Sequence, residues 1–115
     1  MFASIDIFIE EWNRLCIQYF PNARLETVYH RSAMASLRLI ITPHLFVDIY
    51  CNTRTARFDF SLIQESVRIF GYDNLQSWHC HPFNNTDTHL DCQEPTLEQM
   101  ISETAALIYR LTPQG

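Results

Sequence analysis

A two-residue hydrophobic period runs through the middle of the chain, from Arg24 to Asp73, and constrains the fold more than any other feature. Polar breaks at residues 42–44, 52–55 and 64–66 divide this stretch and are typical of hairpin turns. Short turns of this kind join antiparallel neighbours. We therefore predict five strands in chain order, carrying the alternating sets Leu25, Thr27 and Tyr29; Leu37, Leu39 and Ile41; Leu45, Val47, Ile49 and Cys51; Ala56, Phe58, Phe60 and Leu62; and Val67 and Ile69.

Amphipathic segments flank the alternating region on both sides. Apolar side chains such as Phe8 and Trp12 recur at three- and four-residue intervals near the N-terminus, and a second such stripe follows the capping-box pair Thr96 and Gln99. The sequence thus predicts an α+β fold in which a five- to six-stranded antiparallel meander sheet carries an N-terminal and a C-terminal helix packed on it. The expected boundaries, within one domain over residues 1–115, are helix 4–20, meander 24–73, loop 74–94 and helix 96–111.

The predicted turns also imply which residues face each other across the sheet. We expect Leu39 opposite Val47, Ile49 opposite Phe58, and Phe60 opposite Ile69, all on one face. The second face then has Arg38 opposite Asp48, Asp48 opposite Asp59, and Arg57 between Tyr50 and Tyr72. Ile40, Phe46, Ile63 and Phe70 also belong to it. A half-apolar face usually meets another surface, which makes a homodimer or a protein partner reasonable.

Charge and cysteine content narrow the classes of function. The 115 residues carry 13 acids and 8 bases, a net charge of −5, and every base is arginine. This balance disfavours a broad electrostatic nucleic-acid binder, but arginine suits a local anion site. Charges within the first helix argue against a secretory signal, and no apolar run suits a membrane span. We therefore expect a cytoplasmic protein, no membrane, and four free thiols rather than disulfides.

Histidines in the predicted loop are the main candidates for chemistry. If residues 78–81 are extended, His79 and His81 project to one side, and His89 follows. Imidazoles titrate near neutrality, so this group can supply the acid and the base that cleave an RNA phosphodiester. Arg68 or Arg57 would steady the phosphate charge, and Asp73 would orient one imidazole.

Other interpretations stay open. The histidines can instead fix the loop by hydrogen bonds to the main chain, or His79, His81, His89 and Cys92 can ligate zinc, although their spacing is not that of a closed zinc site. Asp48 and Asp59 are either neutralised by arginines or hold magnesium. Cys80 is a conceivable nucleophile, and Trp78 can stack on a base or anchor the core.

The run RIFGYDNLQSWHCHPFNNTDTHLDCQEPTLEQMI, residues 68–101, resembles the signature of the TumE-type toxins of type II toxin–antitoxin systems. Family members have an arginine before a Tyr/Asp-Asn strand end, then histidine-rich residues, and Glu-Pro-Ser/Thr-Leu-Glu at the last helix. The preceding FVDIYCNTRTARFDFSLI also resembles the family's hairpin, so the resemblance covers about the C-terminal two thirds of the chain. The chain departs from the family in having fewer clustered histidines, with Cys80 between two of them, and no lysine.

The resemblance implies a growth-inhibiting toxin that is neutralised by a cognate antitoxin and acts on RNA as a metal-independent ribonuclease, without a cofactor. Its alternative is a non-catalytic binding module or homodimer in which the loop is structural or zinc-bound. The matching catalytic positions are Arg68, Asp73, His79, His81 and His89, and those expected to bind substrate are Arg57, Tyr72, Asn74 and Trp78.

Overall fold

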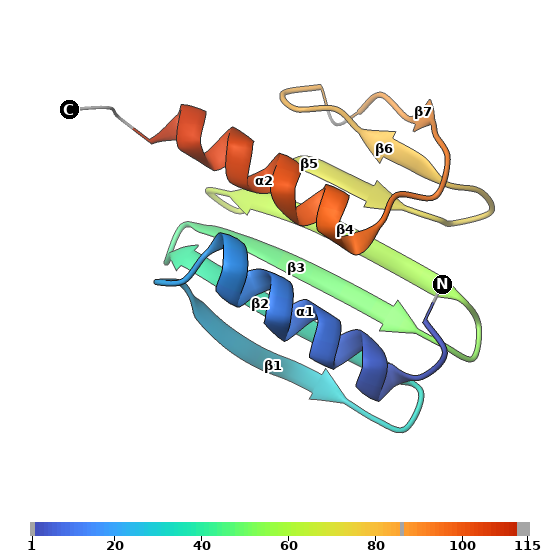
Figure 1. The fold of residues 1–115 in the computed structure, drawn as a ribbon. Helices are drawn as coiled ribbons and strands as arrows, with labels where there is room; N and C mark the ends of the chain where they lie inside the picture. The colour runs from blue at the N-terminus through green and yellow to red at the C-terminus, as the bar shows by residue number, and fades with distance from the viewer. Residues whose placement is uncertain (1, 86, 113–115) are drawn as a thin grey trace.

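The computed structural model describes residues 2–85 and 87–112 and has two helices and a single antiparallel sheet. Its seven strands lie side by side in chain order (Figure 1), which confirms the predicted α+β meander and adds short strands within the loop. The elements are α1 (Ile5–Tyr19), β1 (Arg24–His30), β2 (Met34–Thr42), β3 (Leu45–Asn52), β4 (Arg57–Gln64), β5 (Val67–Asp73), β6 (His79–His81), β7 (Leu90–Asp91) and α2 (Leu97–Leu111).

Both helices lie on one face of the sheet (Figure 1), and each begins after a capping residue, of which the sequence predicts Thr96. The Ser4 hydroxyl accepts from the N–H of Ile7, and the Thr96 hydroxyl accepts from the N–H of Gln99. The core between helices and sheet is closed by fully buried side chains such as Phe8, Trp12, Leu15, Phe58 and Phe60. In the described part of the chain, neither helix has the length and apolarity needed to cross a membrane.

The register between β3 and β4 differs from the prediction. Arg38 does lie opposite Asp48 as expected, but Asp48 faces Ser61 and Asp59 faces Tyr50. The physical reason is the connecting turn, in which the side-chain oxygen Oδ1 of Asn52 accepts from the N–H groups of residues 54 and 55, and Asn52 pairs with Arg57. The predicted Asp48–Asp59 pair is therefore wrong, and so is the position of Arg57 between Tyr50 and Tyr72.

A second correction concerns which side of β5 faces the helices. Glu65 and Ser66 both have positive φ and form a tight turn, but a bulge follows it, so that Ile63 pairs with Arg68 while Leu62 pairs with Phe70. Phe70 and Tyr72 consequently join the helix-side core, contrary to the prediction, whereas Ile69 packs against that core as expected and Val67 is exposed. Gly71 and Asp73 take the opposite side, which we call the open face.

Gly71 is placed where no side chain fits. A Cβ atom added to it would lie 2.5 Å from the main-chain oxygen of Phe60 and 3.3 Å from the side chain of Arg68. Because the first obstacle is backbone of the adjacent strand, it cannot rotate away. Glycine at this position lets β4 and β5 approach beside the bulge and leaves room on the open face for the Arg68 side chain.

Gly71→Ala is expected to lower the free energy of unfolding by about 1–3 kcal/mol, because the strands must shift to accommodate the methyl group. Urea denaturation followed by circular dichroism measures this change. Val67→Ala, an exposed position in the same strand, is the control and should change stability by less than about 1 kcal/mol. Equal stability of Gly71→Ala and the wild type would show that the two strands are not this close.

Candidate functional site

The pairing of β5 with β6 assembles the candidate site on the open face. Asp73 pairs with His79, and Gly71 pairs with His81. Between them, Tyr72 faces the helices, since its hydroxyl donates to Glu103 Oε2 of α2 over 2.7 Å. Because side chains alternate along a strand, Asp73, His79 and His81 must project to the open face.

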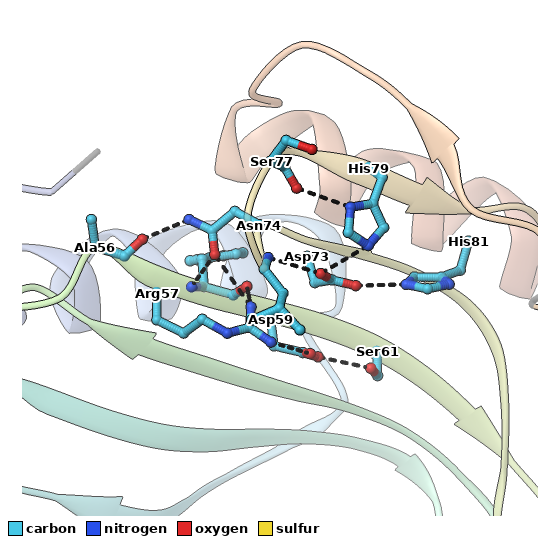
Figure 2. A network of polar contacts seen from close by, with 11 residues as sticks. Ala56, Arg57, Asp59, Ser61, Asp73, Asn74, Ser77, His79 and His81 are labelled. Carbon is cyan, nitrogen blue, oxygen red and sulfur yellow. Dashed lines mark hydrogen bonds and ion pairs between the residues drawn. The ribbon is translucent and has the colours of Figure 1, made fainter.

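The Asp73 carboxylate is shared by two imidazoles. Its Oδ2 lies 2.6 Å from Nε2 of His81, and its Oδ1 lies 3.1 Å from Nε2 of His79. The main-chain N–H of Leu75 also donates to Oδ1, over 3.0 Å. Figure 2 shows both rings directed at this one carboxylate. The predicted contact between Asp73 and an imidazole is present, and a second imidazole shares the carboxylate.

His79 is held from both ends of its ring. Nδ1 lies 2.9 Å from the carbonyl oxygen of Ser77, while Nε2 faces Asp73 (Figure 2). A carbonyl oxygen only accepts, so Nδ1 carries a proton. The role of Ser77 was missed by sequence reasoning, because any residue supplies a main-chain carbonyl and no sequence signal marks it.

The third imidazole arrives on the loop between β6 and β7. The N–H of Asn84 donates to the carbonyl of Ile69 in β5, which brings the loop back against that strand. The ring centroid of His89 then lies 4.5 Å from that of His81 and 5.1 Å from that of His79. We call His79, His81 and His89, with Asp73, the imidazole cluster; ligand atoms of the three histidines lie within 4.8 Å of one another.

The imidazole cluster has two buried residues and two that are accessible to solvent. His81 is fully buried and Asp73 is 6% exposed, whereas the side chain of His79 is 14% exposed and His89 is open to solvent. Burial raises the pKa of Asp73, but the hydrogen bonds from His81 and Leu75 and the nearby histidine charges lower it, leaving the pKa below its usual value. The carboxylate is therefore ionised at neutral pH.

The predicted arginines lie on the same face as the cluster. The Arg68 side chain passes over Gly71, the residue opposite His81. Arg57 lies one strand further, with Nη1 donating to the carbonyl of Phe58 over 2.6 Å and Nη2 lying 3.6 Å from Asp59 (Figure 2). The Arg68 side chain thus lies beside the cluster, and Arg57 lies on the neighbouring strand β4.

The Asn74 side chain forms hydrogen bonds that extend the sheet. Its amide oxygen accepts from the N–H of Phe58 over 2.7 Å and from Arg57 over 3.2 Å, and its amide nitrogen donates to the carbonyl of Ala56 over 2.6 Å. These contacts continue the β4–β5 ladder past its end. The side chain expected to bind substrate is therefore occupied with joining two strands.

Tyr72 and Trp78 lie away from the cluster. Tyr72 faces α2, and the ring of Trp78 packs against Phe58 of the core with centroids 5.6 Å apart. The prediction that they contact the same ligand as the histidines is contradicted by these positions. For Tyr72, the cause of this difference is the bulge, which turned the side chain toward the helices. For Trp78, the structure shows the alternative in which the ring anchors the core.

The cysteines are also separate from the imidazole cluster. Cys80 pairs with Tyr72 and so shares its helix-facing side, and Cys92 is near enough to Cys80 for their charges to interact. Burial raises the pKa of Cys80 and of Cys92, and that of the buried thiols Cys16 and Cys51 to about 12 and about 11. All four are free. Cys80 is thus no activated nucleophile, and Cys92 is not in the group of possible metal ligands with the three histidines.

Comparison with known proteins adds no identity: no family model, no curated protein and no solved structure matches the chain. The geometry alone therefore supports the functional argument. It brings together four of the five predicted catalytic residues, namely Asp73, His79, His81 and His89, and places the fifth, Arg68, beside them.

Asp73→Asn is expected to destabilise the fold by about 1–3 kcal/mol, because it removes a charged acceptor from the buried His81 ring. Asp87→Asn changes an exposed carboxylate of the same loop region and is the matched control. Urea unfolding of both variants measures the difference. If the two variants are equally stable, the contact between Asp73 and His81 contributes nothing to the fold.

Cys80 and Cys92 are expected to react with iodoacetamide at pH 7.5 more slowly than free cysteine, because their raised pKa values leave little thiolate. Mass spectrometry of the alkylated protein follows the rate at each site. Protein unfolded in urea is the control and should react at the rate of free cysteine. Faster labelling of native Cys80 would contradict this and restore the nucleophile hypothesis.

Proposed function

We propose that the protein is the toxin-like component of a type II toxin–antitoxin pair and that its imidazole cluster cleaves RNA phosphodiesters without a metal. The observation that carries this proposal is the convergence of three imidazoles on an open sheet face, two of them held by one buried carboxylate. The resemblance of residues 68–101 to the TumE-type toxins supplies the biological class.

Such a cluster suits cleavage in which the 2′-hydroxyl of RNA attacks its own phosphate. One imidazole takes the proton of the 2′-hydroxyl as its oxygen bonds to phosphorus, and a protonated imidazole donates to the departing 5′-oxygen, which leaves a 2′,3′-cyclic phosphate. His89 is exposed and His79 is partly accessible, so these two are the proposed acid–base pair, in which Nε2 of His79 would leave Asp73 to reach the substrate. Asp73 and the buried His81 position them.

The charge distribution supports a local contact with RNA. Although the chain carries a net charge of −5, Arg68 lies beside the cluster and Arg57 on the next strand. Guanidinium groups at these positions would stabilise charge on a phosphate bound at the histidines.

The open face is also where we propose that a partner docks. A hollow of 190 Å³, lined by residues including Arg38, Asp48 and Tyr50, extends over β1 to β4, and one of its lining residues, Asp59, pairs with Asp73 of the cluster. A cognate antitoxin that covers this face would block access to His89. The same face would serve a homodimer, the second arrangement that its mixed composition suggested.

His89→Ala is expected to lower the rate of RNA cleavage by the purified protein at least about 100-fold, because acid–base groups typically contribute that much. The rate is measured on a labelled single-stranded RNA in the presence of a chelator. His44→Ala removes an exposed histidine from the turn between β2 and β3 and is the matched control, which should cleave like the wild type. When each variant is expressed without a partner, cells with His89→Ala should grow, and cells with His44→Ala should still arrest.

Two outcomes would contradict the proposal. Wild-type protein that leaves RNA intact would refute the ribonuclease activity, and healthy growth on its expression would refute the toxin. Cleavage by His89→Ala at the wild-type rate would show that His89 is not an acid–base group of the reaction.

A further inference from the structure

The three imidazoles form a set of nitrogen donors that comes from two segments of the chain. His79 and His81 come from β6, and His89 comes from the loop that precedes β7. We propose that His79, His81 and His89 together bind one divalent transition-metal ion of the zinc type, with Asp73 as a fourth ligand or as the carboxylate that orients the rings. This inference does not depend on the proposed ribonuclease activity.

His79 gives the first argument, because its ring is already oriented as a ligand. Its Nδ1 lies 2.9 Å from the carbonyl oxygen of Ser77, which leaves Nε2 as the nitrogen that faces the cluster. Nε2 lies 3.1 Å from Asp73 Oδ1, so a cation bound there would contact both atoms. A main-chain carbonyl on the far ring nitrogen is the outer contact that metal-bound histidines usually have.

The spacing of the donors gives the second argument. Zinc–nitrogen bonds of about 2.0–2.1 Å place the nitrogens of one tetrahedral ion about 3.4 Å apart. The three ligand atoms here lie within 4.8 Å of one another, so the set must contract by only a fraction of this distance. His89 is exposed on a loop and can move inward, while Asp73 and the buried His81 are already fixed. The site would thus close on an ion from the solvent side.

Donor chemistry selects the class of ion. Three imidazoles favour zinc, cobalt, nickel or copper over magnesium and calcium, which prefer oxygen ligands. Thiolate is absent from the donor set, because Cys80 faces the helices and Cys92 is not part of the group. This distinguishes the site from the mixed histidine and cysteine zinc site that was one sequence-based alternative.

The test is a calorimetric titration of the full chain with Zn²⁺ alone, after a chelator has removed any bound metal. We expect one equivalent of zinc, no binding of Mg²⁺, and a rise in melting temperature with zinc. His89→Ala, an exposed position whose substitution leaves the core intact, should weaken zinc binding at least about 10–100-fold. His44→Ala is the matched control and should bind like the wild type, because His44 lies at the β2–β3 turn.

Cobalt gives a second, spectroscopic readout. A Co²⁺ complex should show visible ligand-field bands without the near-ultraviolet charge-transfer band of a thiolate ligand, and Cys80→Ser should leave its spectrum unchanged. Failure of wild-type protein to bind zinc, equal binding by His89→Ala, or a thiolate band that disappears in Cys80→Ser would overturn the proposed site.

The failures of this inference and of the proposed function are distinguishable. Zinc binding is measured without RNA, so a chain that binds zinc but cleaves no RNA refutes only the ribonuclease. Conversely, cleavage by a chain that binds no zinc refutes only the metal site. If both hold, zinc would occupy the nitrogens that the proposed cleavage uses, and saturating Zn²⁺ should abolish cleavage until a chelator restores it.

Discussion

The arrangement of the C-terminal half depends on the Asp73 carboxylate and the two imidazoles that share it. A carboxylate buried to this degree is costly unless positive charge and hydrogen bonds compensate it. His81, His79 and the N–H of Leu75 provide that compensation together. These contacts hold β6 against β5 and give the polar loop a fixed point over the sheet. The candidate site is therefore also part of what stabilises this end of the sheet.

The position of Asp73 follows in turn from the backbone of the preceding hairpin. The bulge beside Leu62 changes the phase of β5, so Phe70 and Tyr72 fill the core and Asp73 reaches the open face. Gly71 permits this because it allows the Phe60 carbonyl to approach closely. A one-residue change of phase would have buried Asp73 among aromatic side chains and exposed Tyr72. The phase of β5 thus fixes both the packing of the core and the position of the site.

The sheet separates apolar and polar chemistry onto its two faces. The helix side holds the aromatic core and thiols whose raised pKa values keep them protonated, whereas the open face gathers arginines, carboxylates and imidazoles. On an acidic chain without lysine, this face carries separate arginines rather than a broad basic surface. Local recognition of a phosphate, and neutralisation by a protein that covers the face, both agree with such a distribution.

The sequence by itself determined the elements and their order. Period-two alternation, the capping box at Thr96 and short turns predict the helices and the meander, because these patterns act between neighbours along the chain. The chemistry of the residue types named Asp73 and the three histidines as candidates. Only the tertiary structure decided the registers of β4 against β3 and of β5 against β4, since one extra residue in a turn or a bulge moves every later pair without altering the hydrophobic pattern. Tertiary contacts also turned Tyr72 and Trp78 toward the core and engaged the Asn74 side chain in hydrogen bonds to β4. They brought His89 close to His81, a proximity that no spacing along the chain encodes.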